Sequence, residues 1–227
     1  MIPVLLIGKS FLRQNRWLLL TLAAWPFVTA AFLRFPNGSV SHADVQEALP
    51  QQVLYGVAVI TFLVSSALHN ERRSRRIIAV LSKAVSRTEY LLGMLLGAGC
   101  CAAAYFAAVG GSLLWMLGYS RAVFTALPVL FVCGCLACLW MAALALLLST
   151  FLYPFFAAAI AAGVAAIPVL SPLTRSIFVP AALIEDAVSF SSQINWTIVM
   201  IALLEAAVMV GLASSIFARG DVTVSVE

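Results

Sequence analysis

Long apolar runs separated by short polar stretches make up most of this chain. Six of the runs are long enough to cross a hydrocarbon core, which takes about 20 residues of helix. We therefore expect an all-α integral membrane protein with six transmembrane helices, folded as a single transmembrane domain over residues 1–227. The expected spans are residues 17–33, 52–69, 90–117, 122–149, 151–172 and 194–217.

The first sixteen residues show a different pattern, in which basic and apolar positions recur at helical spacing. Lys9, Arg13 and Arg16 fall on one helix face, and apolar side chains cover much of the rest. An amphipathic segment of this kind lies in the membrane interface, with its cations near the lipid headgroups. We expect residues 1–16 to form an interfacial helix; the alternative is that they only extend the first span.

Two connections between the spans are longer than the others. Residues 34–51 are rich in polar residues, proline and glycine, and are expected to form a polar loop. Residues 173–193 are apolar but interrupted by Pro180 and by Glu185-Asp186. They are too short to span the membrane, so we expect a re-entrant or interfacial segment before the last helix.

Composition supports a protein that faces lipid, because 63% of the residues are hydrophobic and 10% are charged. Soluble domains average about 45–50% apolar and about 25% charged residues. The net charge of +4 does not indicate nucleic-acid binding, because in a membrane protein the position of Lys and Arg matters more than their sum. A nucleic-acid partner is therefore not expected, whereas the lipid bilayer is.

The positions of the basic residues predict how the chain is oriented. With six spans, both termini lie on one side, and that side holds ten of the thirteen Lys and Arg residues. Since cytoplasmic loops are enriched in Lys and Arg, both termini are expected to be cytoplasmic. The ten are Lys9, Arg13, Arg16, Arg72, Arg73, Arg75, Arg76, Lys83, Arg87 and Arg219, and the other three are Arg34, Arg121 and Arg175.

Residues 71–89, called the charged segment below, carry eight of the 22 formal charges, which are 13 Lys and Arg plus 9 Asp and Glu. Ile77, Ile78 and Leu81 follow its four arginines, which predicts a short helix with one basic and one apolar face. Such a helix suits contact with a protein partner. The alternative is a loop whose arginines only fix the topology and contact lipid phosphates.

From Glu71 to Gly93 the sequence is ERRSRRIIAVLSKAVSRTEYLLG. It resembles the cytoplasmic segment between the second and third helices of ABC-2 type transporter permeases, where a Glu opens a short coupling helix. Ala84 stands where that family commonly has proline, and Arg75-Arg76 where Gly-Thr is frequent. The matching positions are Glu71, Leu81, Ser82, Val85, Ser86, Arg87 and Gly93.

The resemblance implies a permease subunit of an exporter in a bacterial-type plasma (inner) membrane. Such a subunit pairs with a separate ABC-type ATPase, in two copies, and with a second permease subunit, the same or homologous. It binds no cofactor itself, since ATP and Mg are held by the ATPase, and it has no catalytic residues of its own. The residues implied to contact the ATPase are Glu71, Arg72, Arg73, Arg75, Arg76, Ile77, Ile78, Leu81, Ser82, Ser86 and Arg87.

Three function classes remain open at this point. The first is an exporter of a hydrophobic or amphiphilic cargo, which the apolar character of the chain favours. The second is a non-transporting component that uses the same kind of ATPase for mechanical work in cofactor-protein or envelope assembly. The third is a secondary carrier, which would show an inverted repeat with midplane ion sites.

Two further features fall inside the predicted spans. Glu205 is the only carboxylate deep within one, where an ionisable group costs about 2.5–3.5 kcal/mol to insert. We expect Glu205 to face protein or a cavity, either in a functional role or hydrogen-bonded between helices. Cys133, Cys135 and Cys138 lack a nearby histidine and are expected to be packing residues rather than metal ligands.

Overall fold

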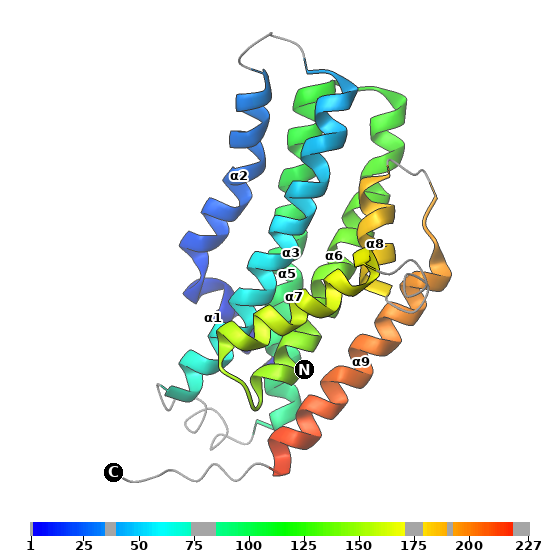
Figure 1. Ribbon diagram of the computed structural model, residues 1–227. Coiled ribbons are helices and arrows are strands. Elements are labelled where there is room, and N and C mark those ends of the chain that lie inside the picture. Colours follow the sequence, from blue (N-terminus) through cyan, green and yellow to red (C-terminus); the bar gives the residue numbers. More distant parts are fainter. Residues whose placement is uncertain (1, 35–39, 74–84, 171–178, 190–192, 220–227) are drawn as a thin grey trace.

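The computed structural model describes residues 2–34, 40–73, 85–170, 179–189 and 193–219, which form helices and no strand (Figure 1). An all-helical protein is what the apolar pattern predicts. The helices are α1 (Ile2–Gln14), α2 (Arg16–Arg34), α3 (His42–Arg73), α5 (Arg87–Leu117), α6 (Arg121–Ser149), α7 (Pro154–Leu170), α8 (Val179–Val188) and α9 (Trp196–Arg219).

Five of the described helices, α2, α3, α5, α6 and α9, are long and apolar enough to cross a membrane. They make the chain a multi-pass integral membrane protein. The remaining predicted span, residues 151–172, corresponds to α7, which has 17 residues. This is shorter than the five spanning helices, which have 19 residues or more, so a sixth crossing stays a prediction.

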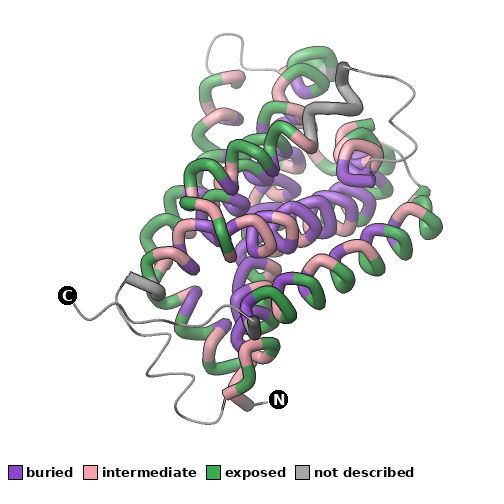
Figure 2. The backbone as a smooth tube through the Cα atoms, turned by 60° about the horizontal axis from the view of Figure 1, so that its bottom comes forward, coloured by how far each residue is buried: buried purple, intermediate pink, exposed green. Residues whose placement is uncertain are grey.

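The core of the bundle lies around α5 and α6. α6 packs against α3, α5, α8 and α9. In the most apolar stretch of α6, 72% of the residues are buried, whereas the corresponding fraction in α2 is 17%. Figure 2 shows the buried positions gathered in the middle of the bundle and the exposed ones along its outer helices. α6 is thus a central helix, and α2 lies at the periphery.

Two adjacent aromatic residues connect α5 to its neighbours α3 and α6. Tyr105 and Phe106 are each 1% exposed and meet edge to face, with their ring centroids 5.4 Å apart. Tyr105 lies against Gly56 of α3 and Phe106 against Gly134 of α6. A Cβ atom at those glycines would lie 2.1 Å and 2.4 Å from the rings. The two glycines therefore allow α3 and α6 to approach α5 closely.

The prediction of a polar loop over residues 34–51 is wrong from residue 42 onward, because these residues form the start of α3, which begins at His42. The backbone N–H of Ser41 donates to the Asp44 carboxylate at 2.9 Å, and the Asp44 N–H donates to the Ser41 hydroxyl at 3.2 Å. This reciprocal pair satisfies donors that a helix start otherwise leaves unpaired. α3 then continues past Pro50 and ends at Arg73, later than the predicted end at residue 69.

Within the predicted re-entrant or interfacial segment over residues 173–193, the structure describes the short helix α8. Pro180 is the second residue of α8, in the first turn, where a missing N–H costs no helical hydrogen bond. Glu185 and Asp186 lie within the same helix, which has 10 residues and is too short to span a membrane. α8 buries Leu183 and Ala187 and packs mainly against α6.

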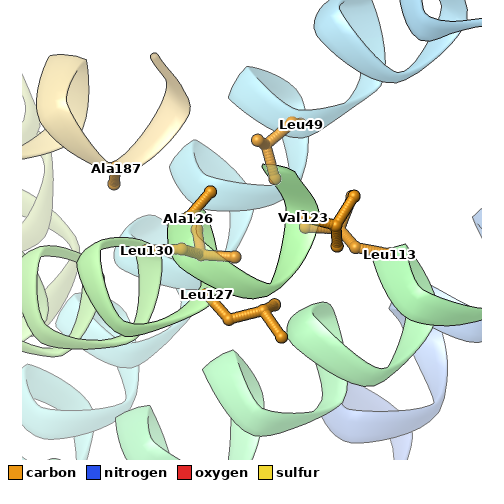
Figure 3. Close-up of a pocket in the computed structure, with 7 residues that line it drawn as sticks. All are labelled: Leu49, Leu113, Val123, Ala126, Leu127, Leu130 and Ala187. Atoms are coloured by element: carbon orange, nitrogen blue, oxygen red, sulfur yellow. The ribbon is translucent and has the colours of Figure 1, made fainter. Parts of the chain in front are cut away.

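A small cavity lies where α8 meets α3, α5 and α6 (Figure 3). Its volume is about 10 Å³, and its lining side chains, which include Leu49, Leu130 and Ala187, are all apolar. A cavity of this size is at the lower limit for one water molecule, and the lining offers no polar side chain to hold one. It is a packing gap of the core.

Candidate functional site at the charged end of the bundle

The structure describes both borders of the charged segment. The backbone of Glu71, Arg72 and Arg73 forms the last residues of α3, and Val85 leads into α5. We call this side of the molecule the charged end and the opposite side the far end. The predicted amphipathic helix, with Arg75, Arg76, Ile77, Ile78, Leu81 and Ser82, lies outside the described residues.

Ser86 fixes the start of α5 as its N-cap. The N–H of Glu89 donates to the Ser86 hydroxyl at 3.2 Å, and the N–H of Ser86 donates to the Glu89 carboxylate at 2.9 Å. The Ser86 hydroxyl also donates to that carboxylate at 3.0 Å. This is a capping box, which satisfies two helix donors reciprocally. Its Ser-x-x-Glu pattern is visible in the sequence and could have predicted the start of α5.

Arg87 connects the start of α5 to the end of α9. Its Nη1 donates a hydrogen bond to the main-chain oxygen of Phe217, and its guanidinium carbon lies 5.6 Å from the centre of the Phe217 ring. Phe217 belongs to the last turn of α9, where carbonyls lack helical partners and carry partial negative charge. Arg87 was predicted to contact an ATPase. In the structure its side chain caps the C-terminal end of α9.

α1 packs along the same part of α5. A Cβ atom at Gly93 would lie 2.7 Å from the Cβ of Ile7, and one at Gly97 would lie 2.7 Å from the Phe11 ring. These glycines, four residues apart, form a small-residue surface of the kind that lets helices approach. α1 turns away from α2 at Asn15 and buries Phe11 and Gly8 against α5, while Lys9 stays exposed.

The α6–α7 connection reaches the charged end as well. The ring of His69, near the end of α3, lies 5.6 Å from the ring of Tyr153, at an angle of 51°. Figure 1 shows the end of α3, the start of α5 and the end of α9 at the same end of the bundle. The two borders of the charged segment therefore lie at the same end of the bundle as parts of several helices, of which α5 contacts both α1 and α9.

Glu205 faces α6. The indole Nε1 of Trp140 donates to Glu205 Oε2 at 2.7 Å, and Trp140 is only 4% exposed. A hydrogen bond to a carboxyl group offsets part of the cost of holding it within an apolar helix. The contact joins α6 and α9, which is the structural role considered for this residue.

The five cysteines are free, and Cys101, Cys133 and Cys138 are buried among apolar side chains. Cys135 is partly buried and Cys100 is exposed. In the part of the chain that the structure describes, no group of three or more His, Cys, Asp or Glu residues could hold a metal ion.

No protein-family model matches this chain, and neither does any curated protein.

Proposed function

We propose that this chain is the membrane-spanning permease subunit of an ATP-binding-cassette exporter. In this proposal a separate ATPase docks on the charged segment from the cytoplasm and drives movement of a hydrophobic or amphiphilic cargo out of the cell. The observation that carries the proposal is the contact of Arg87 with Phe217. Arg87 is the first residue of α5 and also holds the end of α9. A single residue of the charged segment therefore connects two helices of the bundle.

This arrangement gives a displacement of the charged segment a direct route into the bundle. A push on Ser86 and Arg87 acts on the start of α5 through the capping box and on the end of α9 through the guanidinium. α1 would move together with α5, because Ile7 and Phe11 of α1 are packed against glycines of α5. Helices transmit such a displacement along their length because their packed contacts resist deformation.

Docking itself would depend on the residues before Ser86. Ile77, Ile78 and Leu81 supply an apolar anchor for a groove of the ATPase, because buried apolar side chains contribute most of the affinity at such interfaces. Arg75 and Arg76 steer the segment towards an acidic rim, since charge complementarity governs association rate and orientation. ATP and Mg bind the ATPase, and a second permease subunit completes the cargo route.

The test is charge reversal of Arg75→Glu together with Arg76→Glu in the full-length protein. We expect the double variant to lose co-purification of an ATPase that carries a phosphate-binding loop, or to lose stimulation of its ATPase activity by cargo. Arg34→Glu with Arg121→Glu is the matched control, because it reverses two charges at the far end. Unchanged co-purification and stimulation in the first variant, at equal membrane levels, would refute the proposal.

A further inference from the structure

The two faces of α1 have different surroundings. Gly8 and Phe11 are buried against α5, where the Phe11 ring lies beside Gly97. The opposite face is exposed and carries Lys9 and Arg13. These two residues are four positions apart, so their side chains are neighbours on the helix surface. A single phosphate group can therefore pair with both of them.

The helices against which α1 packs, α5 and α2, supply no free counter-charge for these cations. Residues 1–43, which include α1 and α2, contain no Asp or Glu. α5 has one acidic residue, Glu89, and its carboxylate already accepts hydrogen bonds from the N–H and the hydroxyl of Ser86. The exposed face of α1 is thus a positively charged surface whose counter-ion comes from elsewhere.

The residues that follow α1 place this surface at the edge of the bilayer. α2, one of the helices able to span the membrane, begins at Arg16, so Arg13 lies within about one turn of a span and Lys9 within about two. Trp17 is 70% exposed, and the Arg16 guanidinium carbon lies 5.4 Å from the centre of its ring. Exposed Trp and Arg at the end of a span are typical of the headgroup region. Lipid headgroups are therefore the anions nearest to Lys9 and Arg13.

Apolar side chains border the two cations. Leu5 and Leu6 are 59% and 61% exposed, and Leu5 lies about one helical turn from Lys9. A phospholipid presents the matching combination, a phosphate group joined to apolar chains, and amphipathic helices bind it through both parts. A free anion would leave the two leucines exposed. The surface therefore fits an anionic phospholipid better than it fits inorganic phosphate.

We propose that the exposed face of α1 binds a phospholipid whose headgroup carries a net negative charge. Its phosphate pairs with Lys9 and Arg13, and one of its chains lies against Leu5 and Leu6. A zwitterionic headgroup brings a cation of its own, which Lys9 and Arg13 repel, so it binds more weakly. The sequence predicts only that α1 lies at the interface, whereas this site selects among lipids. It depends neither on an ATPase nor on cargo transport.

Photo-labelling of the full chain in phosphatidylcholine vesicles tests this selection. A trace of phosphatidylglycerol or of phosphatidylcholine, each with the same photoreactive acyl chain, is added, and the labelled peptides are identified by mass spectrometry. The reference for lipid contact is α6 around Phe131, which is 39% exposed and belongs to a helix whose only charged residue is Arg121. Relative to this reference, we expect α1 to prefer phosphatidylglycerol about fivefold, which is the effect of one cation at an anionic membrane surface.

Three double variants locate the preference. Lys9→Gln with Arg13→Gln should remove it, whereas Lys9→Arg with Arg13→Lys exchanges the two cations and should keep it. Arg34→Gln with Arg121→Gln removes two exposed cations at the far end and should leave the preference of α1 unchanged. All four substituted side chains are exposed, so we expect each variant to fold, and thermal unfolding checks this.

Equal labelling of α1 by the two lipids in the wild type would overturn the proposal. A preference that survives Lys9→Gln with Arg13→Gln would do the same. Sodium phosphate and sodium chloride are also compared at equal ionic strength, and we expect both to weaken the preference equally by screening. Its loss in phosphate alone would assign the surface to a free anion instead of a lipid and would contradict the proposal.

Discussion

The two ends of α5 are held very differently. At the charged end, its first three turns contact α1 through Gly93 and Gly97 and α9 through Arg87, and a capping box fixes its start. At the far end, α5 stops at Gly118, whose φ of 71° favours glycine. There, the Arg34 side chain donates an exposed hydrogen bond of 3.4 Å to the main-chain oxygen of Trp115, and its guanidinium carbon lies 5.7 Å from the centre of the Trp115 ring.

This difference shows where force could enter the bundle. A contact of 3.4 Å between exposed groups is weak, whereas helices packed backbone to backbone cannot move independently. The charged end therefore couples α5 to α1 and α9, whereas at the far end α5 packs through buried side chains such as Leu113 and Met116. The following substitutions compare matched positions at the two ends, beginning with the largest expected effect.

Gly93→Ala and Gly111→Ala place the same methyl group at opposite ends of α5. At Gly93 it would lie 2.7 Å from Ile7 and 3.0 Å from the main-chain oxygen of Val4, whereas at Gly111 it meets only the edge of the Phe27 ring at 3.3 Å. We expect Gly93→Ala to reduce the free energy of unfolding by about 1–3 kcal/mol through overpacking. Reversible unfolding in mixed micelles measures both variants, and similar losses at the two positions would contradict the comparison.

Arg87→Met removes the cap on α9, and Arg121→Met is its counterpart in the first turn of α6. We expect a loss of about 1 kcal/mol for Arg87→Met, together with faster amide exchange in the last turn of α9. Arg121→Met should cost nothing, because a cation is not favoured at a helix N-terminus. If amide exchange near Phe217 is unchanged in Arg87→Met, the guanidinium does not hold α9.

Ser86→Ala and Ser120→Ala compare the N-caps of α5 and α6. Ser86 belongs to a capping box with Glu89, whereas Ser120 only accepts one hydrogen bond of 3.3 Å from Val123. We expect a loss of about 1 kcal/mol at Ser86 and about half of that at Ser120. Amide exchange in the first turn of each helix reports the effect, and a reversed order of the two losses would contradict it.

Asp186 in α8 gives the smallest expected effect. Burial, and secondarily the neighbouring Glu185 carboxylate, raises the pKa of Asp186, and its Oδ2 has no hydrogen-bond partner. A raised pKa means that the folded state binds a proton more tightly than the unfolded state. Stability from this group should thus increase as pH falls from 7 through the raised pKa. Thermal unfolding at several pH values should show this trend in the wild type and lose it in Asp186→Asn.

The sequence predicts the helices better than it predicts their contacts. Apolar runs of about 20 residues locate α2, α3, α5, α6 and α9, because lipid requires each span to be apolar and helical. The Ser41–Asp44 pair that starts α3 is a local signal within reach of sequence analysis.

The contacts between helices have no such local signal. Arg87 and Phe217 are separated by 130 residues in the sequence. The contact of Gly134 with Phe106 depends on how α6 and α5 are rotated about their own axes relative to each other, and both helices are apolar on all faces. Gly93 and Gly97 indicate close packing, yet only the structure identifies α1 as the partner.

Crosslinking from the charged segment tests the central claim most directly. A photo-crosslinking amino acid replaces Arg76 in one variant and Arg121, at the far end, in the other, and both are irradiated in intact cells. We predict that position 76 forms a crosslink with a cytoplasmic ATPase that carries a phosphate-binding loop, and that position 121 does not. Crosslinks from position 76 only to lipid, or to proteins outside the cytoplasm, would contradict the account.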